Sequence, residues 1–292
     1  MKVLITGATG LVGKKLVQKL TSNGIAVNYL THSKKSIPET ALIKAFYWNL
    51  EKETIDKEAI LNVDAIIHLA GATVSKRWTP RYQKEILNSR VNGIKLLIKT
   101  LQKNPNHQVK HFISASGISI YPTSLSQQYN EFSTSVGHGF LAEVVQKWEQ
   151  AVNELDVLNI KTAKIRTGLV LDPHQGAFPI MYKTVKNYVG ANFGNGKQIY
   201  SWIHIDDLVG VYQYVLQNKL EGVYNAVASN PVSANVFLNT LAKASDTKIW
   251  LPNIPSIFLN LGLGQMSSLL LDSQYVLNDK IKATGFVFKH DF

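Results

Sequence analysis

Short apolar segments alternate with amphipathic helical segments along the first half of the chain. Residues 2–6 are apolar, β-prone and too short for a helix, and a helical pattern with Leu16, Val17 and Leu20 on one face follows them. Further strands are predicted at residues 25–31, 42–48, 63–70, 110–115 and 159–166, and helices at 80–101 and 140–155. This alternation predicts parallel βαβ units and therefore an α/β fold built on a doubly wound parallel sheet.

The start of the longest predicted helix is marked by its own sequence. Thr79 is a favoured residue for the position before a helix, and Pro80 is favoured at the first helical position, where no backbone N–H is needed. We therefore expect this helix to begin at residue 80.

The pattern changes near Gly168. The following segment to about residue 201 is richer in Gly, Asn and Tyr, and helices are then predicted at 204–217 and 233–244, with a strand at 222–227. We interpret residues 1–167 as a nucleotide-binding domain. Residues 168–292 are expected to form a smaller substrate-binding lobe, partly interleaved with the sheet, that covers its open end.

Composition narrows the class of protein. The 292 residues are 45% hydrophobic and 17% charged, which is typical of a globular protein, and the lack of cysteine excludes disulfides, thiolate metal sites and thiol catalysis. The most apolar stretch, residues 254–271, is interrupted by Pro255, Asn260 and Gln265, so no membrane span is predicted. A strand directly after Met1 leaves no room for a targeting peptide, and we expect a cytoplasmic protein.

The net charge of +11 is consistent with nucleic-acid binding, with attraction of an anionic ligand, or with a lysine-rich surface. The lysines are scattered at helix-surface spacing, without interleaved aromatic residues. The pattern favours a solvated surface that attracts an anionic cofactor, and no nucleic-acid partner is predicted.

A glycine-rich segment, GATGLVG, joins the first strand to the first helix. Gly7 allows a tight turn, Gly10 allows a pyrophosphate to approach the backbone, and Gly13 allows the helix to pack close to the strand. Backbone N–H groups at a helix N-terminus bind anions, so this segment predicts a dinucleotide site, with a plain turn as the alternative.

The end of the second strand indicates which dinucleotide is preferred. A carboxylate that binds the ribose 2′-OH is typical of NAD sites, whereas this chain has His32, Ser33, Lys34 and Lys35 there. A hydroxyl, an imidazole and two ammonium groups suit a 2′-phosphate, which favours NADP(H) over NAD(H). The alternative is that these lysines are exposed loop residues.

Taken together, these motifs resemble the extended short-chain dehydrogenase/reductase superfamily and, within it, the atypical group of nucleoside-diphosphate-sugar epimerases. The matching segments follow in order along nearly the whole chain: GATGLVG at 7–13, HLAG at 68–71, RWT at 77–79, SRV at 89–91, SAS at 114–116, FLA at 140–142, WE at 148–149, RTGLVL at 166–171, SWIHIDD at 201–207 and GF at 285–286. The resemblance implies a Rossmann-type sheet with a smaller C-terminal substrate lobe.

The resemblance also implies roles for individual residues. It assigns the pyrophosphate to the glycine turn, through Gly7, Thr9, Gly10, Leu11, Val12 and Gly13. His32, Ser33, Lys34 and Lys35 would face the 2′-phosphate, where the family often has Arg at the His32 position. Leu69, Ala70 and Gly71 would line the adenosine and ribose, and Ser114 and Ser116 would lie near the nicotinamide. Asn49 stands where the family commonly has Asp.

The family's usual catalytic pair is missing. Extended reductases use Ser or Thr with Tyr-x-x-x-Lys, in which the lysine lowers the pKa of the proton-transferring tyrosine. Ser116 is present, but Leu141 and Val145 occupy the Tyr and Lys positions. The Tyr182–Lys186 pair falls about forty residues too late. Tyr121 is a candidate phenol with Ser116 as its partner, and a packing aromatic is the alternative reading of Tyr121.

Three other sites in the sequence allow both a structural and a functional interpretation. His204, Asp206 and Asp207 lie at a strand-to-helix junction, which favours helix capping over a catalytic or metal role, and no metal site is predicted. His68 is expected to be a hydrogen-bonded core histidine. Arg166 either contacts an anionic substrate or the cofactor, or pairs with a core carboxylate such as Glu149.

Two functions from different classes remain. The first is an NADP-dependent oxidoreductase or epimerase that acts on a nucleotide sugar or a similar small molecule with a nonstandard proton carrier. The second is an NADP(H)-binding sensor or scaffold without turnover, which the missing Tyr and Lys favour. The sequence leaves open whether the chain forms a homodimer.

Overall fold

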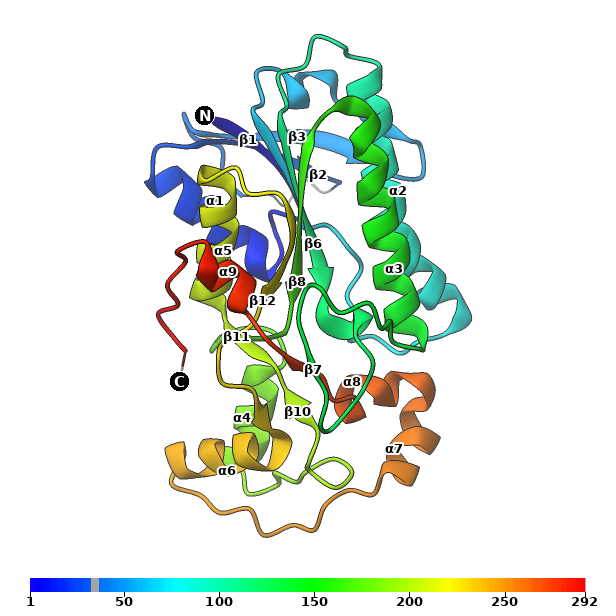
Figure 1. Ribbon diagram of the computed structural model, residues 1–292, viewed down its shortest axis with the longest axis vertical. Coiled ribbons are helices and arrows are strands. Elements are labelled where there is room, and N and C mark those ends of the chain that lie inside the picture. The colour runs from blue at the N-terminus through cyan, green and yellow to red at the C-terminus, as the bar shows by residue number, and fades with distance from the viewer. Residues whose placement is uncertain (33–36, 292) are drawn as a thin grey trace. The chain divides into compact units, whose positions relative to one another are not determined.

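The computed structural model describes residues 1–32 and 37–291, which form two compact units (Figure 1). The sheet unit consists of Met1–Ser116, Val144–Arg166 and Val209–Tyr224. The second unit consists of Gly117–Glu143, Thr167–Leu208 and Asn225–Phe292. The sheet unit thus takes one of its segments from well beyond residue 167, where the sequence pattern changes.

The sheet unit is built on an eight-stranded sheet with the order β12-β8-β6-β5-β1-β2-β3-β4. The strands are β1 (Lys2–Thr6), β2 (Ala26–Thr31), β3 (Ile43–Asn49), β4 (Thr54–Ile55), β5 (Ala65–His68), β6 (His111–Gly117), β8 (Lys161–Thr167) and β12 (Gly222–Ala226). Strand β1 pairs in parallel with β2 and β5, β2 with β3, and β5 with β6, whereas β4 is antiparallel to β3. The strand order reverses between β1 and β5. The predicted Rossmann-type α/β fold is confirmed.

Helices cover both faces of this sheet (Figure 1). They are α1 (Leu11–Ser22), α2 (Pro80–Gln102), α3 (Phe140–Asn153) and α5 (Ile205–Gln217), with short 3-10 turns η1 (Lys57–Ile60) and η3 (Glu154–Leu158). Helix α2 begins at the predicted residue, because the Thr79 side chain accepts a hydrogen bond from Tyr82 N and Pro80 opens the helix. Apolar side chains of α2 and α3, including Leu97 and Val152, pack on Ile66 and Phe112 of the sheet.

The second unit contains short strands and helices. Its strand pairs are β7 (Gln128–Tyr129) with β14 (Tyr275–Val276), β9 (Leu169–Leu171) with β11 (Trp202–His204), and β10 (Ile199–Tyr200) with β13 (Val232–Ser233). Its helices are α4 (Phe178–Lys186), α6 (Ala234–Ala244), α7 (Ser256–Leu263), α8 (Ser268–Leu271) and α9 (Asp279–Ala283), with 3-10 turns η2 (Ile118–Ile120) and η4 (Gly264–Ser267). Val185 of α4 and Leu238 of α6 belong to a small separate core.

Over the described residues, every helix is too short or too polar to cross a membrane.

Candidate functional site: a dinucleotide turn and a separate cavity

The glycine turn lies where β1 ends, next to the point at which the strand order of the sheet reverses. Gly7 has φ +70°, a left-handed conformation that favours glycine, and its carbonyl accepts a 3.0 Å hydrogen bond from Gly10 N. A Cβ on Gly13 would lie only 2.2 Å from Gly7 O, so the helix can approach the turn this closely only without a side chain. Ligands of doubly wound sheets bind at such a reversal point.

Helix α1 presents an open N-terminus to this turn. Its N-cap is Gly10, which supplies no side-chain capping bond, and its first turn carries no acidic residue. Among the described residues, a Cβ built on Gly10 would meet only Gly7 O, at 3.3 Å, so the outer side of Gly10 is open space. Unpaired N–H groups, a positive helix end and an open backbone fit the pyrophosphate of a dinucleotide.

The loop after β5 is held against the glycine turn by Thr6. The Thr6 hydroxyl accepts hydrogen bonds from Leu69 N and Ala70 N, each 3.2 Å long, and bonds to His68 Nδ1 at 2.8 Å. Burial lowers the pKa of His68 to about 3, so its imidazole is neutral at physiological pH. His68 is the hydrogen-bonded core histidine that the sequence predicts.

Arg90 of α2 supports the same loop, a role that the sequence did not indicate. Its Nη1 donates to Ala72 O at 3.1 Å and to Ile86 O at 2.8 Å, and its guanidinium lies 5.0 Å from the Trp148 ring centre. A Cβ on Gly71 would come within 2.9 Å of Arg90 Cζ. Burial lowers the pKa of Arg90 to about 10, so the side chain remains charged at neutral pH.

The predicted 2′-phosphate residues follow β2. His32 is exposed directly after this strand. Ser33, Lys34 and Lys35 lie outside the described residues, so their contact with a phosphate stays a prediction. At the end of β3, Asn49 Oδ1 accepts a 2.9 Å hydrogen bond from Lys52 N.

The two predicted nicotinamide residues lie on β6 and are buried. Ser114 Oγ donates to Ala115 O at 2.8 Å, and Ser116 Oγ donates to Glu149 Oε1 at 2.6 Å. The Glu149 carboxylate also accepts from Arg166 Nε and Nη2, each at 2.8 Å. Of the two alternatives for Arg166, the structure confirms the pair with Glu149. The hydroxyl of Ser116 is thus directed to a buried ion pair.

Within the second unit, Tyr121 and Leu141 line a cavity of about 200 Å³. Tyr121 is 1% exposed, its hydroxyl donates to Asn225 Oδ1 at 2.9 Å, and its ring stacks on Tyr129. Leu141 is the residue that the resemblance aligns with the family's tyrosine, and Val145, which it aligns with the lysine, is buried one helical turn later on α3.

Two titratable groups that the sequence did not single out line the same cavity. His138 lies on the loop before α3, and Asp272 follows α8; partial burial raises the pKa of the Asp272 carboxyl. Asp272 reaches the cavity from more than a hundred residues beyond Leu141, so no local pattern could have indicated it. A raised pKa makes a carboxyl better suited to donate a proton than an ordinary aspartate.

The His204, Asp206 and Asp207 group lies at the start of α5, as expected. His204 Nδ1 accepts a 3.2 Å hydrogen bond from Asp206 N, a capping contact. Asp207 does something that the capping prediction did not include. Its two buried carboxylate oxygens accept hydrogen bonds from Lys289 N and His290 N, each 2.8 Å long.

The Tyr182–Lys186 pair is also located by the structure. Both residues lie on α4, where Tyr182 stacks on Phe178 and packs against the small core around Val185.

The strand order and the glycine turn together define a Rossmann-type fold with a dinucleotide-binding turn. The chain belongs to the NAD dependent epimerase/dehydratase family, whose sequence pattern matches residues 3–227. A domain of unknown function, DUF1731, matches residues 254–291. The resemblance seen in the sequence is thereby confirmed.

Individual relatives agree with this assignment. An epimerase family protein of Staphylococcus aureus strain N315 is 35% identical over 290 residues, which cover 98% of this chain and 94% of that protein. The crystal structure of the human epimerase family protein SDR39U1 with NADPH superposes with a TM-score of 0.85 at 28% identity, covering 100% of this chain and 96% of that one. The UDP-glucose 4-epimerase of Thermotoga maritima with UDP-glucose shares the fold, with a TM-score of 0.78 at 18% identity over 99% of this chain and 94% of that one.

Proposed function

We propose that this protein binds NADP(H) and is an oxidoreductase or epimerase acting on a nucleotide sugar or a similar small molecule. The observation that carries the proposal is the open N-terminus of α1 at Gly10, beside a turn that only glycine fits at Gly13. The close packing at Gly13 brings the helix N-terminus to the turn, and the open backbone at Gly10 matches the needs of a dinucleotide pyrophosphate.

The preference for NADP(H) rests on the segment after β2. His32, Ser33, Lys34 and Lys35 offer positive charge and hydrogen-bond donors but no carboxylate for a ribose 2′-OH. NADPH in the crystal structure of human SDR39U1 supports the same preference. Leu69, Ala70 and Gly71 line the adenosine and ribose in this proposal, and Ser114 lies near the nicotinamide.

The bound nicotinamide supplies reversible hydride transfer, and the chain must supply the proton. Ser116 and Tyr121 are the proposed catalytic residues. The cavity that Tyr121 lines also contains the Asp272 carboxyl, so the second unit offers a phenol and an acid of raised pKa to one small-molecule ligand. In the proposed enzyme these two groups are the candidates for the proton carrier in place of the family's tyrosine.

A cofactor sensor without turnover is the second candidate. Leu141 and Val145 favour it, because neither side chain can carry or stabilise a proton. The two candidates share the cofactor site and differ only in whether a substrate reacts.

The cofactor site is tested by titrating NADPH, NADH, NADP and NAD against the wild type and three variants. Gly10→Ala places a methyl group on the open side of the turn and should weaken binding at least about tenfold without loss of folding, because Gly10 has an ordinary φ of −78°. Gly262→Ala is the matched control, since a Cβ there meets nothing within 4 Å. Lys34→Ala/Lys35→Ala should reduce the preference for NADPH over NADH. Equal binding by all variants, or none by the wild type, would refute the site.

Turnover separates the two candidates. The protein is incubated with NADPH or NADP and a panel of nucleotide sugars, and exchange of the hydrogen at nicotinamide C4 is followed by mass spectrometry. Exchange that depends on a sugar nucleotide supports the enzyme. Tight cofactor binding with no exchange across the panel supports the sensor.

A further inference from the structure

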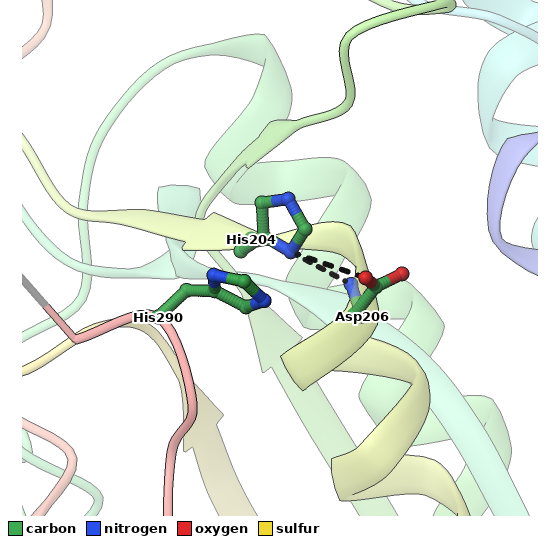
Figure 2. Close-up of side chains that lie close together, drawn as sticks. All are labelled: His204, Asp206 and His290. Carbon is green, nitrogen blue, oxygen red and sulfur yellow. Dashed lines mark hydrogen bonds and ion pairs between the residues drawn. The ribbon is translucent and has the colours of Figure 1, made fainter.

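Two histidines and one aspartate meet in the second unit, where His204 and Asp206 are near neighbours in sequence and His290 comes from much later in the chain (Figure 2). His204 is the last residue of β11, Asp206 lies in the first turn of α5, and His290 lies near the C-terminus. One ligand atom from each side chain lies within 4.8 Å of the other two. In Figure 2, His204 Nδ1 and a ring nitrogen of His290 both point toward the Asp206 carboxylate.

The backbone on both sides of His290 is fixed in place. The Asp207 carboxylate, which is 2% exposed, accepts hydrogen bonds from Lys289 N and His290 N. On the other side, the Asp291 carboxylate accepts from Ser229 N, and the Asp291 carbonyl accepts from Asn230 Nδ2. These hydrogen bonds on both sides of His290 hold its backbone in place and thereby position its imidazole beside His204.

His204 and Asp206 are equally well positioned. His204 pairs in the β11–β9 ladder opposite Leu171, and Asp206 is part of a helix that begins one residue after His204. The His204 Nδ1 to Asp206 Oδ2 distance is 3.8 Å, too long for a strong hydrogen bond, and the two imidazole centres are 3.9 Å apart. The three side chains thus converge on one region of the second unit.

Such spacing suits a shared metal ion. Zinc bonds of about 2.0–2.2 Å at tetrahedral angles place neighbouring ligand atoms roughly 3.4 Å apart. The ligand atoms of the three side chains lie within 4.8 Å of one another, and modest rotations of these side chains would bring them to that separation. Two imidazole nitrogens and one carboxylate oxygen are ligands for borderline transition metals, whereas magnesium and calcium prefer oxygen alone. The negative charges of Asp206 and Asp207 offset the positive end of α5 that a cation would face.

We propose that His204, Asp206 and His290 bind one divalent transition-metal ion of the zinc type. The three protein ligands leave a coordination position for water or a small ligand. By binding both His290 and Asp206, the ion would connect the C-terminal segment to the start of α5. This connection would add to the hydrogen bonds that Asp207 accepts from Lys289 N and His290 N. This proposed site shares no residue with the dinucleotide turn, and the proposal does not depend on the proposed function.

The test uses full-length protein without a polyhistidine tag, freed of metal by a chelator that is then removed. Zn²⁺ is titrated by calorimetry, and Co²⁺ by visible absorbance, which reports the coordination geometry. The wild type should bind one ion, and His290→Ala and Asp206→Asn should each weaken Zn²⁺ binding at least about tenfold. His174→Ala removes an exposed histidine of the same unit and should leave binding unchanged.

Amide exchange gives an independent readout in the wild type. Zn²⁺ should slow the exchange of the backbone amides at residues 289–291 several-fold in the wild type and leave it unchanged in Asp206→Asn, whereas excess Mg²⁺ should have no effect. Absence of Zn²⁺ binding, or equal affinity in the wild type and both ligand variants, would overturn the proposal. Because Gly10→Ala should bind Zn²⁺ like the wild type, failure of the cofactor site would not be mistaken for failure of this one.

Discussion

Arg166 binds the carboxylate of Glu149 through two hydrogen bonds, Nε to Oε1 and Nη2 to Oε2, each 2.8 Å long. Both side chains are buried, and Oε1 also accepts the hydroxyl of Ser116. A planar two-point contact of this kind fixes both side chains and leaves the Ser116 hydroxyl with one preferred direction. The pair connects β8 to α3 within the sheet unit. We therefore expect a substitution that breaks the pair to lower the stability of the protein, and any change in function to follow from that loss.

Glu149→Gln should lower the free energy of unfolding by about 3–5 kcal/mol, because it removes the negative charge that pairs with the buried Arg166 guanidinium. Urea unfolding monitored by circular dichroism measures the loss. Glu154→Gln, an exposed carboxylate on the following turn, is the control and should change stability by less than about 0.5 kcal/mol. The double variant Glu149→Gln/Arg166→Met should recover part of the loss, and a Glu149→Gln effect below about 1 kcal/mol would contradict a strong buried pair.

Stability should fall in acid because of His68. Its pKa is lowered to about 3 in the folded protein from 6.5, so below pH 6.5 the unfolded chain takes up a proton that the folded chain does not. The contribution of neutral His68 to the free energy of unfolding is therefore fully present above pH 6.5 and is lost as the pH falls toward 3. Between pH 6.5 and 5 the free energy of unfolding should fall by about 2 kcal/mol.

The variant His68→Gln should remove this part of the slope in urea unfolding measured from pH 6.5 to 5. Thr6→Val deletes the hydrogen bond to Nδ1 but keeps the imidazole. It should lower stability by about 1–3 kcal/mol at every pH and retain the slope. A His68→Gln slope equal to that of the wild type would show that other groups control the acid response.

Gly13→Ala should lose both stability and cofactor binding. The new methyl group would lie 2.2 Å from Gly7 O and 2.7 Å from Ala8 Cα, so the turn or α1 must shift. A stability loss of about 1–3 kcal/mol is expected from such overpacking. Thermal unfolding with and without NADPH measures it, with Gly262→Ala as reference; a variant that melts and binds like the wild type would disprove the close contact.

The variant Tyr121→Phe distinguishes the two interpretations of Tyr121, as a proton carrier or as a packing aromatic. The change leaves Asn225 Oδ1 without the Tyr121 donor and should cost about 1–3 kcal/mol of stability. If the phenol transfers the proton, any measured turnover should fall by about a hundredfold or more while NADPH affinity stays unchanged. Tyr129→Phe, which removes the hydroxyl of the stacked neighbour, is the control. Turnover that survives Tyr121→Phe would assign the proton to another group, and Asp272→Asn would be tested next.

The parts of the fold that follow from local pattern were predictable. Helix α2 begins at Pro80 because Thr79 caps it, and the strand, glycine turn and helix at residues 2–22 need only neighbouring residues to form. The pairing of Arg166 with Glu149 was foreseen as one of two alternatives, since a buried arginine near the end of a strand requires a partner.

The remaining parts depend on contacts between residues far apart in the sequence. Strands β7 and β14 are two residues each, and they pair across almost half of the chain. Asp272 and His290 likewise lie near residues that are distant in sequence. Asp272 shares a cavity with Tyr121, and Asp207 places His290 beside His204. Short strands and single polar residues carry no periodicity, so only the folded chain brings them together.

The position of β12 also bears on the synthesis of the protein. Strand β12 forms one edge of the sheet next to β8, yet it comes from residues 222–226. A ribosome that adds about 5–20 residues per second reaches β12 on the order of 10–40 s after starting. Throughout the later part of that interval β8 is an open strand edge on the nascent chain, able to pair with a second copy. The sheet that begins at residue 2 is thus completed only when three quarters of the chain has been made, and newly made protein is most vulnerable to aggregation just before that point.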